Sequence, residues 1–287
     1  MGRPWKVPRE RQRTEAETSP RYSSTKEAVV RQPGVVELAA RYLVGVMYRQ
    51  RTPADRIADR VVAGSAAAKL AVVAAHLAPG VVAYLLLHHA REPISRTLRI
   101  DEATAQVGVI MTSIMIALGG AALLAPRLVD RLPRRDVIAM LGLTRLDPAG
   151  LLIAGVLAVV VLLAPTEWLY EDAFGAWLQN TWLAMPSWHF QRTTAFTEIP
   201  PALAAVALLA NIVGEELWFR GYLYPKLAFL GRWTWPVAGM LFVAYHVFQA
   251  PVAYPGFLGG LALTGLYALR RDLWSCVLLH ALLQAPV

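Results

Sequence analysis

Residues 201–225 read PALAAVALLANIVGEELWFRGYLYP, an apolar stretch of membrane-spanning length that also holds two adjacent glutamates and an arginine. No residue before Glu215 in this stretch is charged, and Glu216 and Arg220 follow closely. A bilayer is crossed by about 20 mainly apolar residues. Ionisable groups inside such a segment are costly and commonly mark a functional site. The stretch therefore predicts a membrane helix that carries chemistry.

The whole chain shares this apolar character. Of its 287 residues, 56% are hydrophobic and only 17% are charged, which is more apolar than a soluble domain of this length. The pattern predicts an all-α, polytopic bundle of about seven transmembrane helices, with the ionisable motifs on the last four. The predicted spans are four blocks of full length, at 70–87, 106–126, 149–165 and 199–219, and three shorter ones, at 234–251, 256–269 and 272–286.

The amino-terminal part has a different composition. Residues 1–33 are rich in Arg, Glu, Ser, Thr and Pro, which predicts disorder, and they contain no signal-peptide core. Residues 35–48 are apolar but interrupted by charges, as in a helix that lies at the membrane interface. We therefore expect three parts: a basic, mostly disordered segment 1–65, membrane helices with a tryptophan-rich outer connection in 66–198, and a helix bundle with the ionisable motifs in 199–287.

Positive charge is concentrated on one side of the predicted spans. Half of the 28 lysines and arginines lie in residues 1–69, whereas Arg192 is the one basic residue of the connection 166–198. The positive-inside rule then predicts a cytoplasmic N-terminus. We expect an integral protein of a bacterial plasma membrane, in contact with the lipid bilayer. These basic flanks account for the net charge of +8, so we expect no nucleic-acid partner.

Besides Glu215, Glu216 and Arg220, three further polar positions in the predicted spans bear on the chemistry. Glu216 and Arg220 are spaced i,i+4 and can form an ion pair on one helix face, which leaves Glu215 without a partner in its own segment. His246 lies in the fifth apolar block, and His280 and Gln284 lie one turn apart in the last. A single buried histidine is usually a hydrogen-bonded core residue. An acid, two histidines and an amide on converging helices, however, form a hydrolytic set.

Other hydrolase signatures are absent from the sequence. It contains neither the HExxH helix of zinc peptidases nor a GxSxG elbow. Cys276 precedes His280 by four residues, a spacing that allows a thiol–imidazole pair, but a free cysteine is more often an apolar packing residue. As the single cysteine, it also excludes an intramolecular disulfide.

Three motifs together resemble a known family. EELWFR, FVAYH and GGLALTGLYALRRDLWSCVLLHALLQ, over about residues 199–286, are similar in order and spacing to the motifs of the CAAX protease and bacteriocin-processing family of intramembrane peptidases. The resemblance implies a membrane helix bundle with a cavity open to the cytoplasm. It also implies hydrolysis of a peptide bond in a membrane-associated protein or peptide substrate.

The resemblance also assigns roles to individual residues. It implies that Glu215 and His246 activate the attacking water, that His280 and the residue at 284 stabilise the oxyanion, and that Glu216 and Arg220 order the site. This chain departs from the family at the last of these positions. The family usually has Asn there, and here the residue is Gln284.

Three functions stay open from the sequence. The first is an intramembrane endopeptidase with no cofactor and no metal. The second is a zinc-dependent form of the same peptidase, in which Glu215, His246 and His280 are the ligands. The third is a non-catalytic membrane protein of the same fold, such as an immunity or scaffold protein, which the departure at Gln284 favours.

Overall fold

The computed structural model describes residues 59, 65–144, 146–163, 198–249 and 259–284, and in this part of the chain every regular element is helical. The all-α prediction is confirmed. The predicted disorder of 1–33, the interfacial helix at 35–48 and the tryptophan-rich connection lie outside the described residues. The elements are α3 (Ala66–His89), α4 (Arg91–Leu98), η1 (Thr104–Met111), α5 (Thr112–Leu128), α6 (Arg134–Met140), α7 (Pro148–Leu163), α10 (Pro201–Glu215), η3 (Glu216–Leu223), α11 (Tyr224–Lys226), η4 (Ala228–Trp233), α12 (Thr234–Tyr245), η5 (His246–Phe248), α13 (Gly259–Arg270) and α14 (Leu273–Gln284).

Three helical segments of the described part are long and apolar enough to cross a membrane. They span Ala66–His89, Thr104–Leu128 and Pro201–Lys226, and so coincide with the first, second and fourth predicted blocks. Two shorter apolar helices, α7 and α14, lie at the third and the last predicted blocks. The membrane helix bundle is therefore confirmed, and the count of seven crossings stays a prediction.

Large apolar side chains cover the outside of these helices. On α7, Leu152 and Leu163 are 71% and 78% exposed, and on α10, Leu209 is 64% exposed. Such a surface is unfavourable in water and suits contact with lipid acyl chains. The chain is an integral membrane protein.

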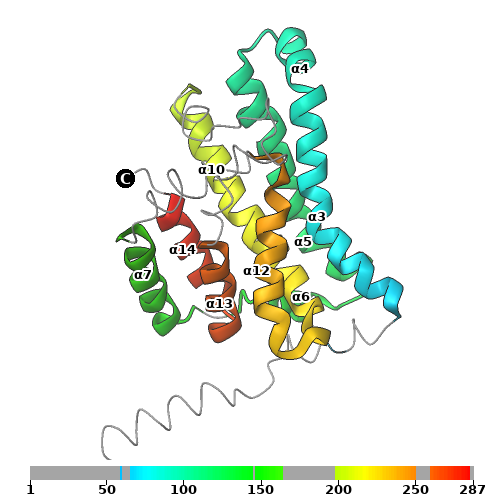
Figure 1. The fold of residues 1–287 in the computed structure, drawn as a ribbon, viewed down its shortest axis with the longest axis vertical. Coiled ribbons are helices and arrows are strands. Elements are labelled where there is room, and N and C mark those ends of the chain that lie inside the picture. The colour runs from blue at the N-terminus through cyan, green and yellow to red at the C-terminus, as the bar shows by residue number, and fades with distance from the viewer. Residues whose placement is uncertain (1–58, 60–64, 145, 164–197, 250–258, 285–287) are drawn as a thin grey trace, which may run out of the picture. The chain divides into compact units, whose positions relative to one another are not determined.

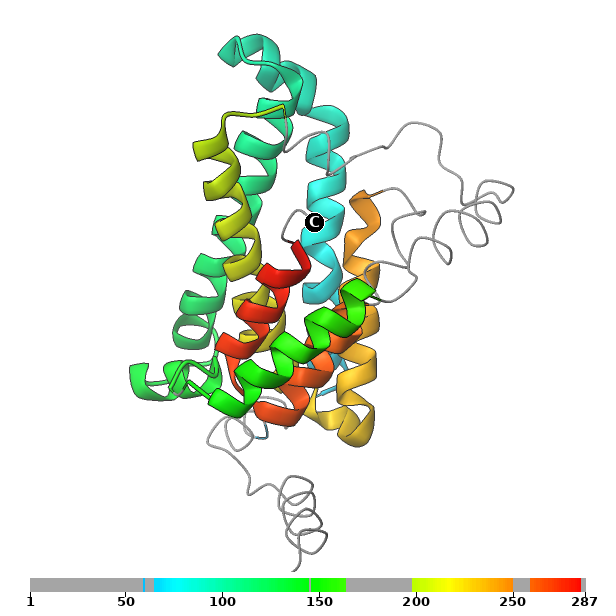
Figure 2. The same ribbon diagram turned by 90° about the vertical axis from the view of Figure 1, so that its left-hand side faces the viewer.

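The helices pack in neighbouring pairs that bring distant parts of the sequence together. α10 packs along α5, α14 along α7, and α12 lies between α3 and α13 (Figures 1 and 2). The α5–α10 pair is especially close at Gly214, where an added Cβ would lie 2.3 Å from the carbonyl oxygen of Met115. Small residues at such crossings let membrane helices approach each other closely.

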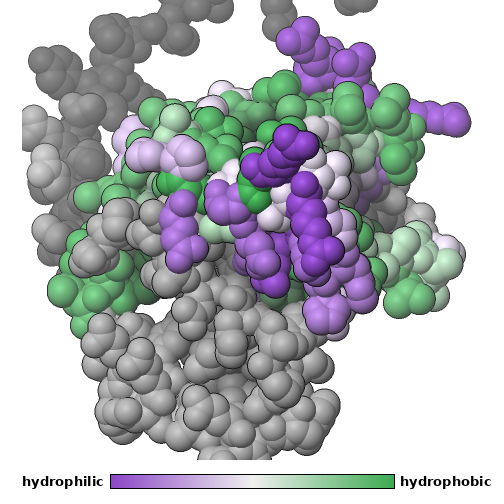
Figure 3. Space-filling model, turned by 90° about the horizontal axis from the view of Figure 1, so that it is seen from above, coloured by the Kyte–Doolittle hydropathy of each residue, from purple (hydrophilic) through white to green (hydrophobic). Residues whose placement is uncertain are grey.

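Two largely buried ion pairs tie the ends of these helices together. Lys226, at the end of α11, lies 2.6 Å from Asp130, just after α5, and Arg270, at the end of α13, lies 2.5 Å from Asp147, just before α7. At the other end of the bundle, α4 has no buried residue. Figure 3, which looks onto that end, shows hydrophilic residues near its centre and hydrophobic surface beside and above them.

Candidate active site

The two acidic residues lie where one helix changes its winding. Glu215 is the last residue of α10, and Glu216 begins the π-helix η3, which also carries Arg220. Short π-helical segments within α-helices are frequent at functional sites. The side chains are deeply buried, with exposed fractions of 2% for Glu215, 0% for Glu216 and 1% for Arg220. Buried charged groups need partners, and the neighbouring helices provide them.

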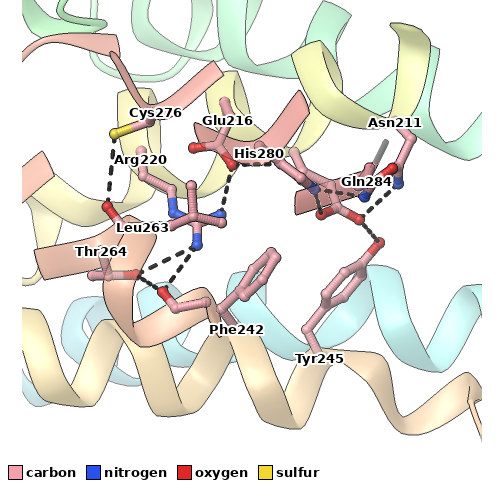
Figure 4. A network of polar contacts seen from close by, with 12 residues as sticks. Asn211, Glu216, Arg220, Phe242, Tyr245, Leu263, Thr264, Cys276, His280 and Gln284 are labelled. Carbon is pink, nitrogen blue, oxygen red and sulfur yellow. Dashed lines mark hydrogen bonds and ion pairs between the residues drawn. The ribbon is translucent and has the colours of Figure 1, made fainter. Parts of the chain in front are cut away.

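The predicted ion pair between Glu216 and Arg220 is present. Nη1 of Arg220 lies 3.0 Å from Oε1 of Glu216. The other end of the guanidinium donates to α13, with Nη2 3.3 Å from the carbonyl oxygen of Gly260 and 3.4 Å from Oγ1 of Thr264. Its central carbon also lies 3.9 Å from the ring centroid of Phe242 on α12. Arg220 thus links η3 to two other helices (Figure 4).

His280 joins the two acids from α14. Its Nδ1 lies 2.8 Å from Oε1 of Glu216, and its Nε2 lies 2.7 Å from the amide nitrogen of Gln284. A carboxylate can only accept and an amide nitrogen can only donate, so Nδ1 carries the proton and Nε2 is the acceptor. The same Nε2 is 4.0 Å from Oε2 of Glu215. His280 therefore faces both carboxylates and bonds directly to one.

Glu215 has partners that the sequence analysis missed. The expectation that it has none in its own segment is wrong: Nδ2 of Asn211, one turn earlier in α10, donates to Oε1 of Glu215 at 3.0 Å. The hydroxyl of Tyr245, at the end of α12, donates to the same oxygen at 3.2 Å. The signal for Asn211 was its i,i+4 spacing from Glu215 in an otherwise apolar helix. Tyr245 carried no comparable signal, since its contact joins residues 30 positions apart.

Gln284 completes a continuous chain of hydrogen bonds. Its Nε2 donates to Oδ1 of Asn211 at 2.9 Å as well as to His280. Both amide hydrogens of Gln284 therefore have acceptors within the protein. To donate to an oxyanion, Gln284 has to break one of these two hydrogen bonds. Asn211 and Gln284 are half-buried, unlike Glu215, Glu216 and His280, so they form the more exposed end of the network (Figure 4).

His246 lies beside this network. It follows directly after α12, in the short helix η5, and it is buried. Its Nδ1 lies 2.8 Å from the carbonyl oxygen of Phe242, and its ring centroid is 4.6 Å from that of Tyr245. The structure thus joins Glu215, Glu216, Arg220, His280 and Gln284 by hydrogen bonds and ion pairs, and it places His246 against Tyr245 next to them.

Two other sequence alternatives can be compared with the geometry. The thiol of Cys276 is directed to the carbonyl oxygen of Leu263 on α13, 3.6 Å away, as expected for a packing residue. A zinc site would need Glu215, His246 and His280 to converge on one point. Among the described residues, no group of three His, Cys, Asp or Glu side chains is arranged to hold a metal ion.

Comparison with known proteins adds one finding. Residues 197–285 match the family model described as type II CAAX prenyl endopeptidase Rce1-like. The matched segment runs from just before α10 to just after α14 and includes every residue of the hydrogen-bond network. The predicted resemblance is confirmed for this part of the chain. No curated protein and no solved structure matches the chain.

Proposed function

We propose that the chain is a membrane-embedded endopeptidase in which Glu215 activates the attacking water and no metal takes part. Its substrate is a membrane-associated protein or peptide. It works in a bacterial plasma membrane with its N-terminus in the cytoplasm. The match to a prenyl endopeptidase family supports the reaction class, and the arrangement around Glu215 supports the role of this residue.

One observation carries the proposal: the two oxygens of Glu215 have different surroundings. Oε1 accepts hydrogen bonds from Asn211 and Tyr245, which fix the carboxylate. Oε2 lies 4.0 Å from Nε2 of His280, too far for a direct hydrogen bond, and no hydrogen bond from the described residues reaches this oxygen. A carboxylate held by one oxygen presents the other to a water, as a general base requires.

The reaction then follows from these positions. Oε2 of Glu215 takes a proton from the water while the water oxygen attacks the scissile carbonyl carbon. The carbonyl oxygen becomes an oxyanion, and Gln284 stabilises it by turning one amide hydrogen away from Asn211. Glu215 returns the proton to the amide nitrogen as the carbon–nitrogen bond breaks. The products are a carboxylic acid and a free amine, and Glu215 is again a carboxylate. His246, against Tyr245, carries away the proton that the product acid then releases.

Glu216 has a separate task in this scheme. It accepts from both Arg220 and His280, so its carboxylate orients the imidazole and balances the arginine charge. A general base must be able to approach the water. Glu216 lies against Nδ1 of His280, and its second oxygen is enclosed without a hydrogen-bond partner in the described part of the chain, whereas Glu215 lies on the Nε2 side of the ring. The two adjacent acids therefore divide into a base and an orienting group.

The non-catalytic alternative has one observation in its favour. Both amide hydrogens of Gln284 are engaged within the protein. The family has Asn at this position, and here Gln284 holds the hydrogen-bond network together instead of presenting a free donor. On this alternative the helix bundle and its polar contacts serve stability alone. It predicts that no peptide is cleaved by the purified protein.

A peptide assay separates these functions. The protein would be reconstituted in liposomes and given a fluorogenic peptide that ends in a farnesylated cysteine followed by three residues. A second peptide of the same sequence without the farnesyl group tests whether the substrate is prenylated. Wild-type protein should cleave at least one of them, and Glu215→Gln should lower turnover about 10²–10⁴-fold, the usual loss for one general base.

The control is the neighbouring acid. Glu216→Gln keeps a side chain of the same shape, so the two variants differ in the position of the lost charge. We expect Glu216→Gln to lower thermal stability more than Glu215→Gln does, since Arg220 then lacks its counter-charge. Near-full turnover in Glu215→Gln would refute the proposed mechanism.

A further inference from the structure

The first long helix, α3, lies outside the family match and yet touches the candidate active site. Gly80 of α3 faces the last residue of α12: a Cβ added at Gly80 would lie 1.8 Å from the carbonyl oxygen of Tyr245 and 2.8 Å from its carbonyl carbon. No side chain fits into that space. The backbone of α3 is therefore in direct contact with the backbone that carries Tyr245.

A second contact joins α3 to the π-helix that carries Glu216. Nε1 of Trp218 donates to the carbonyl oxygen of Ala75 at 3.2 Å. One residue along α3, the buried ring of His76 lies 6.0 Å from the ring of Phe219, which in turn is 4.7 Å from the ring of Tyr245. α3 thus contacts both elements that flank Glu215, α12 and η3.

The position of Tyr245 matters because its hydroxyl holds Oε1 of Glu215. The Tyr245 side chain is fully buried, and its ring centroid lies 5.5 Å from that of Phe248 as well as 4.7 Å from that of Phe219. A tightly packed ring cannot compensate for a displaced backbone by changing rotamer. The place of the hydroxyl is therefore set by the backbone of Tyr245, and that backbone rests on Gly80.

We infer that Gly80 and Tyr245 are positioning residues for the general base. The missing side chain at Gly80 lets α12 approach α3 closely enough for Tyr245 to hold one oxygen of Glu215 and leave the other for water. This inference rests on the proposed peptidase function and extends it to a helix outside the matched segment. Both residues act through Glu215 and neither touches the scissile bond.

The test compares two glycines: Gly80, which is packed against another helix, and Gly120, which borders open space. Gly80→Ala adds one methyl group against Tyr245, and Gly120→Ala adds the same group on α5, where nothing lies within 4 Å of the new atom. With the farnesylated peptide as probe, Gly80→Ala should lower kcat about 10- to 100-fold, the scale of a displacement of about 1 Å. Its KM should stay near that of wild type, and Gly120→Ala should match wild type in both.

Tyr245→Phe removes the hydroxyl alone and should lower kcat roughly tenfold, the scale of one hydrogen bond to a charged group. Because Gly80 is inferred to act through Tyr245, the double variant should be no slower than Gly80→Ala. If the losses of the two single variants multiply instead, Gly80 does not act through Tyr245 and the inference is overturned.

A second measurement needs no substrate. The infrared band of the Glu215 carboxyl group is isolated as the difference between wild type and Glu215→Gln. Loss of the tyrosine hydrogen bond should shift this band in Tyr245→Phe, and the band should move in the same direction in Gly80→Ala but not in Gly120→Ala. An unshifted band in Gly80→Ala overturns the inference. If wild type cleaves no peptide while the bands shift as stated, the proposed function fails and the contact from α3 to Glu215 stands.

Gly80→Ala can also fail to give a monodisperse protein. In that case Trp218→Phe, which removes the hydrogen bond to Ala75 and adds no volume, probes the same packing of α3. It should shift the Glu215 band and lower kcat in the same directions. If Trp218→Phe has the kcat and the Glu215 band position of wild type, the inference is overturned.

Discussion

Replacing Arg220 by Met should destabilise the protein more than any exposed charge replacement. The guanidinium is 1% exposed and lies 3.0 Å from Glu216, which is itself fully buried. Methionine has a similar length and no charge, so Glu216 would keep His280 as its donor and lose its counter-charge. Its Oε2 has no hydrogen-bond partner among the described residues even with Arg220 present. Removing one partner of a buried pair costs about 3–5 kcal/mol.

This cost can be measured as a melting temperature. Because about 1 kcal/mol corresponds to roughly 2–4 °C in a protein of this size class, Arg220→Met should lower Tm by about 6–20 °C. The assay is thermal unfolding of the detergent-solubilised protein, followed by far-ultraviolet circular dichroism. Tm applies here to unfolding of the helix bundle as one cooperative unit.

The chain contains a matched control for this experiment. Arg96 and Glu92 on α4 form an ion pair with the same i,i+4 spacing, but their side chains are 76% and 59% exposed. Arg96→Met should therefore cost only about 0–1 kcal/mol. Combining Arg220→Met with Glu216→Gln should recover part of the lost stability, since no buried charge is then left alone. If Arg220→Met melts at the same temperature as Arg96→Met, the buried pair does not stabilise the site as argued.

Three further predictions concern the oxyanion donor, the metal and the orientation. Gln284→Ala should lower kcat about 10²–10³-fold, the usual loss for one oxyanion donor. Gln284→Asn should lower kcat about tenfold or more, because the shorter amide cannot reach both of its acceptors. An Asn variant faster than wild type would mean that the native site is weakened. Purified active protein should contain less than stoichiometric zinc and should resist phenanthroline, whereas stoichiometric zinc whose removal abolishes turnover would support the zinc-dependent alternative. The Glu92→Cys variant should react with an impermeant maleimide in intact cells, and the Arg135→Cys variant should react only after permeabilisation. The native Cys276 should add little background because it is buried. The reverse labelling pattern would overturn the predicted orientation.

The long helices were predictable because lipid imposes a simple rule on sequence. A segment that faces acyl chains must be apolar over its full length, so blocks 70–87 and 106–126 fall inside the helical spans 66–89 and 104–128. The fifth block, 234–251, was read as one span, but α12 ends at Tyr245 and a short 3-10 turn follows. Hydropathy reports burial in lipid and does not report where the winding changes, so this boundary could not be read from composition.

The candidate site was predictable in part, for a related reason. Charged and polar residues are rare in membrane helices, so Glu215, Glu216, Arg220, His280 and Gln284 stood out one by one, and the structure joins them in one network. The contacts that come from ordinary residues did not stand out. A glycine and a tyrosine are common in membrane helices, and the value of Gly80 and Tyr245 arises only when α3 and α12 are packed together.

The network also explains why two adjacent acids can have different roles. The donors around Glu216 are Arg220, a permanent cation, and His280. The donors that hold Glu215 are an amide and a hydroxyl, both neutral. Charged donors satisfy a carboxylate more strongly than neutral ones, because the hydrogen bond is then assisted by charge. Oε1 of Glu216 is thereby committed to its partners, whereas Glu215 is oriented by neutral donors and its charge is left to act on a water. The departure at Gln284 fits this division, since its longer side chain reaches Asn211 and so helps to hold one of the two neutral donors of Glu215 in place.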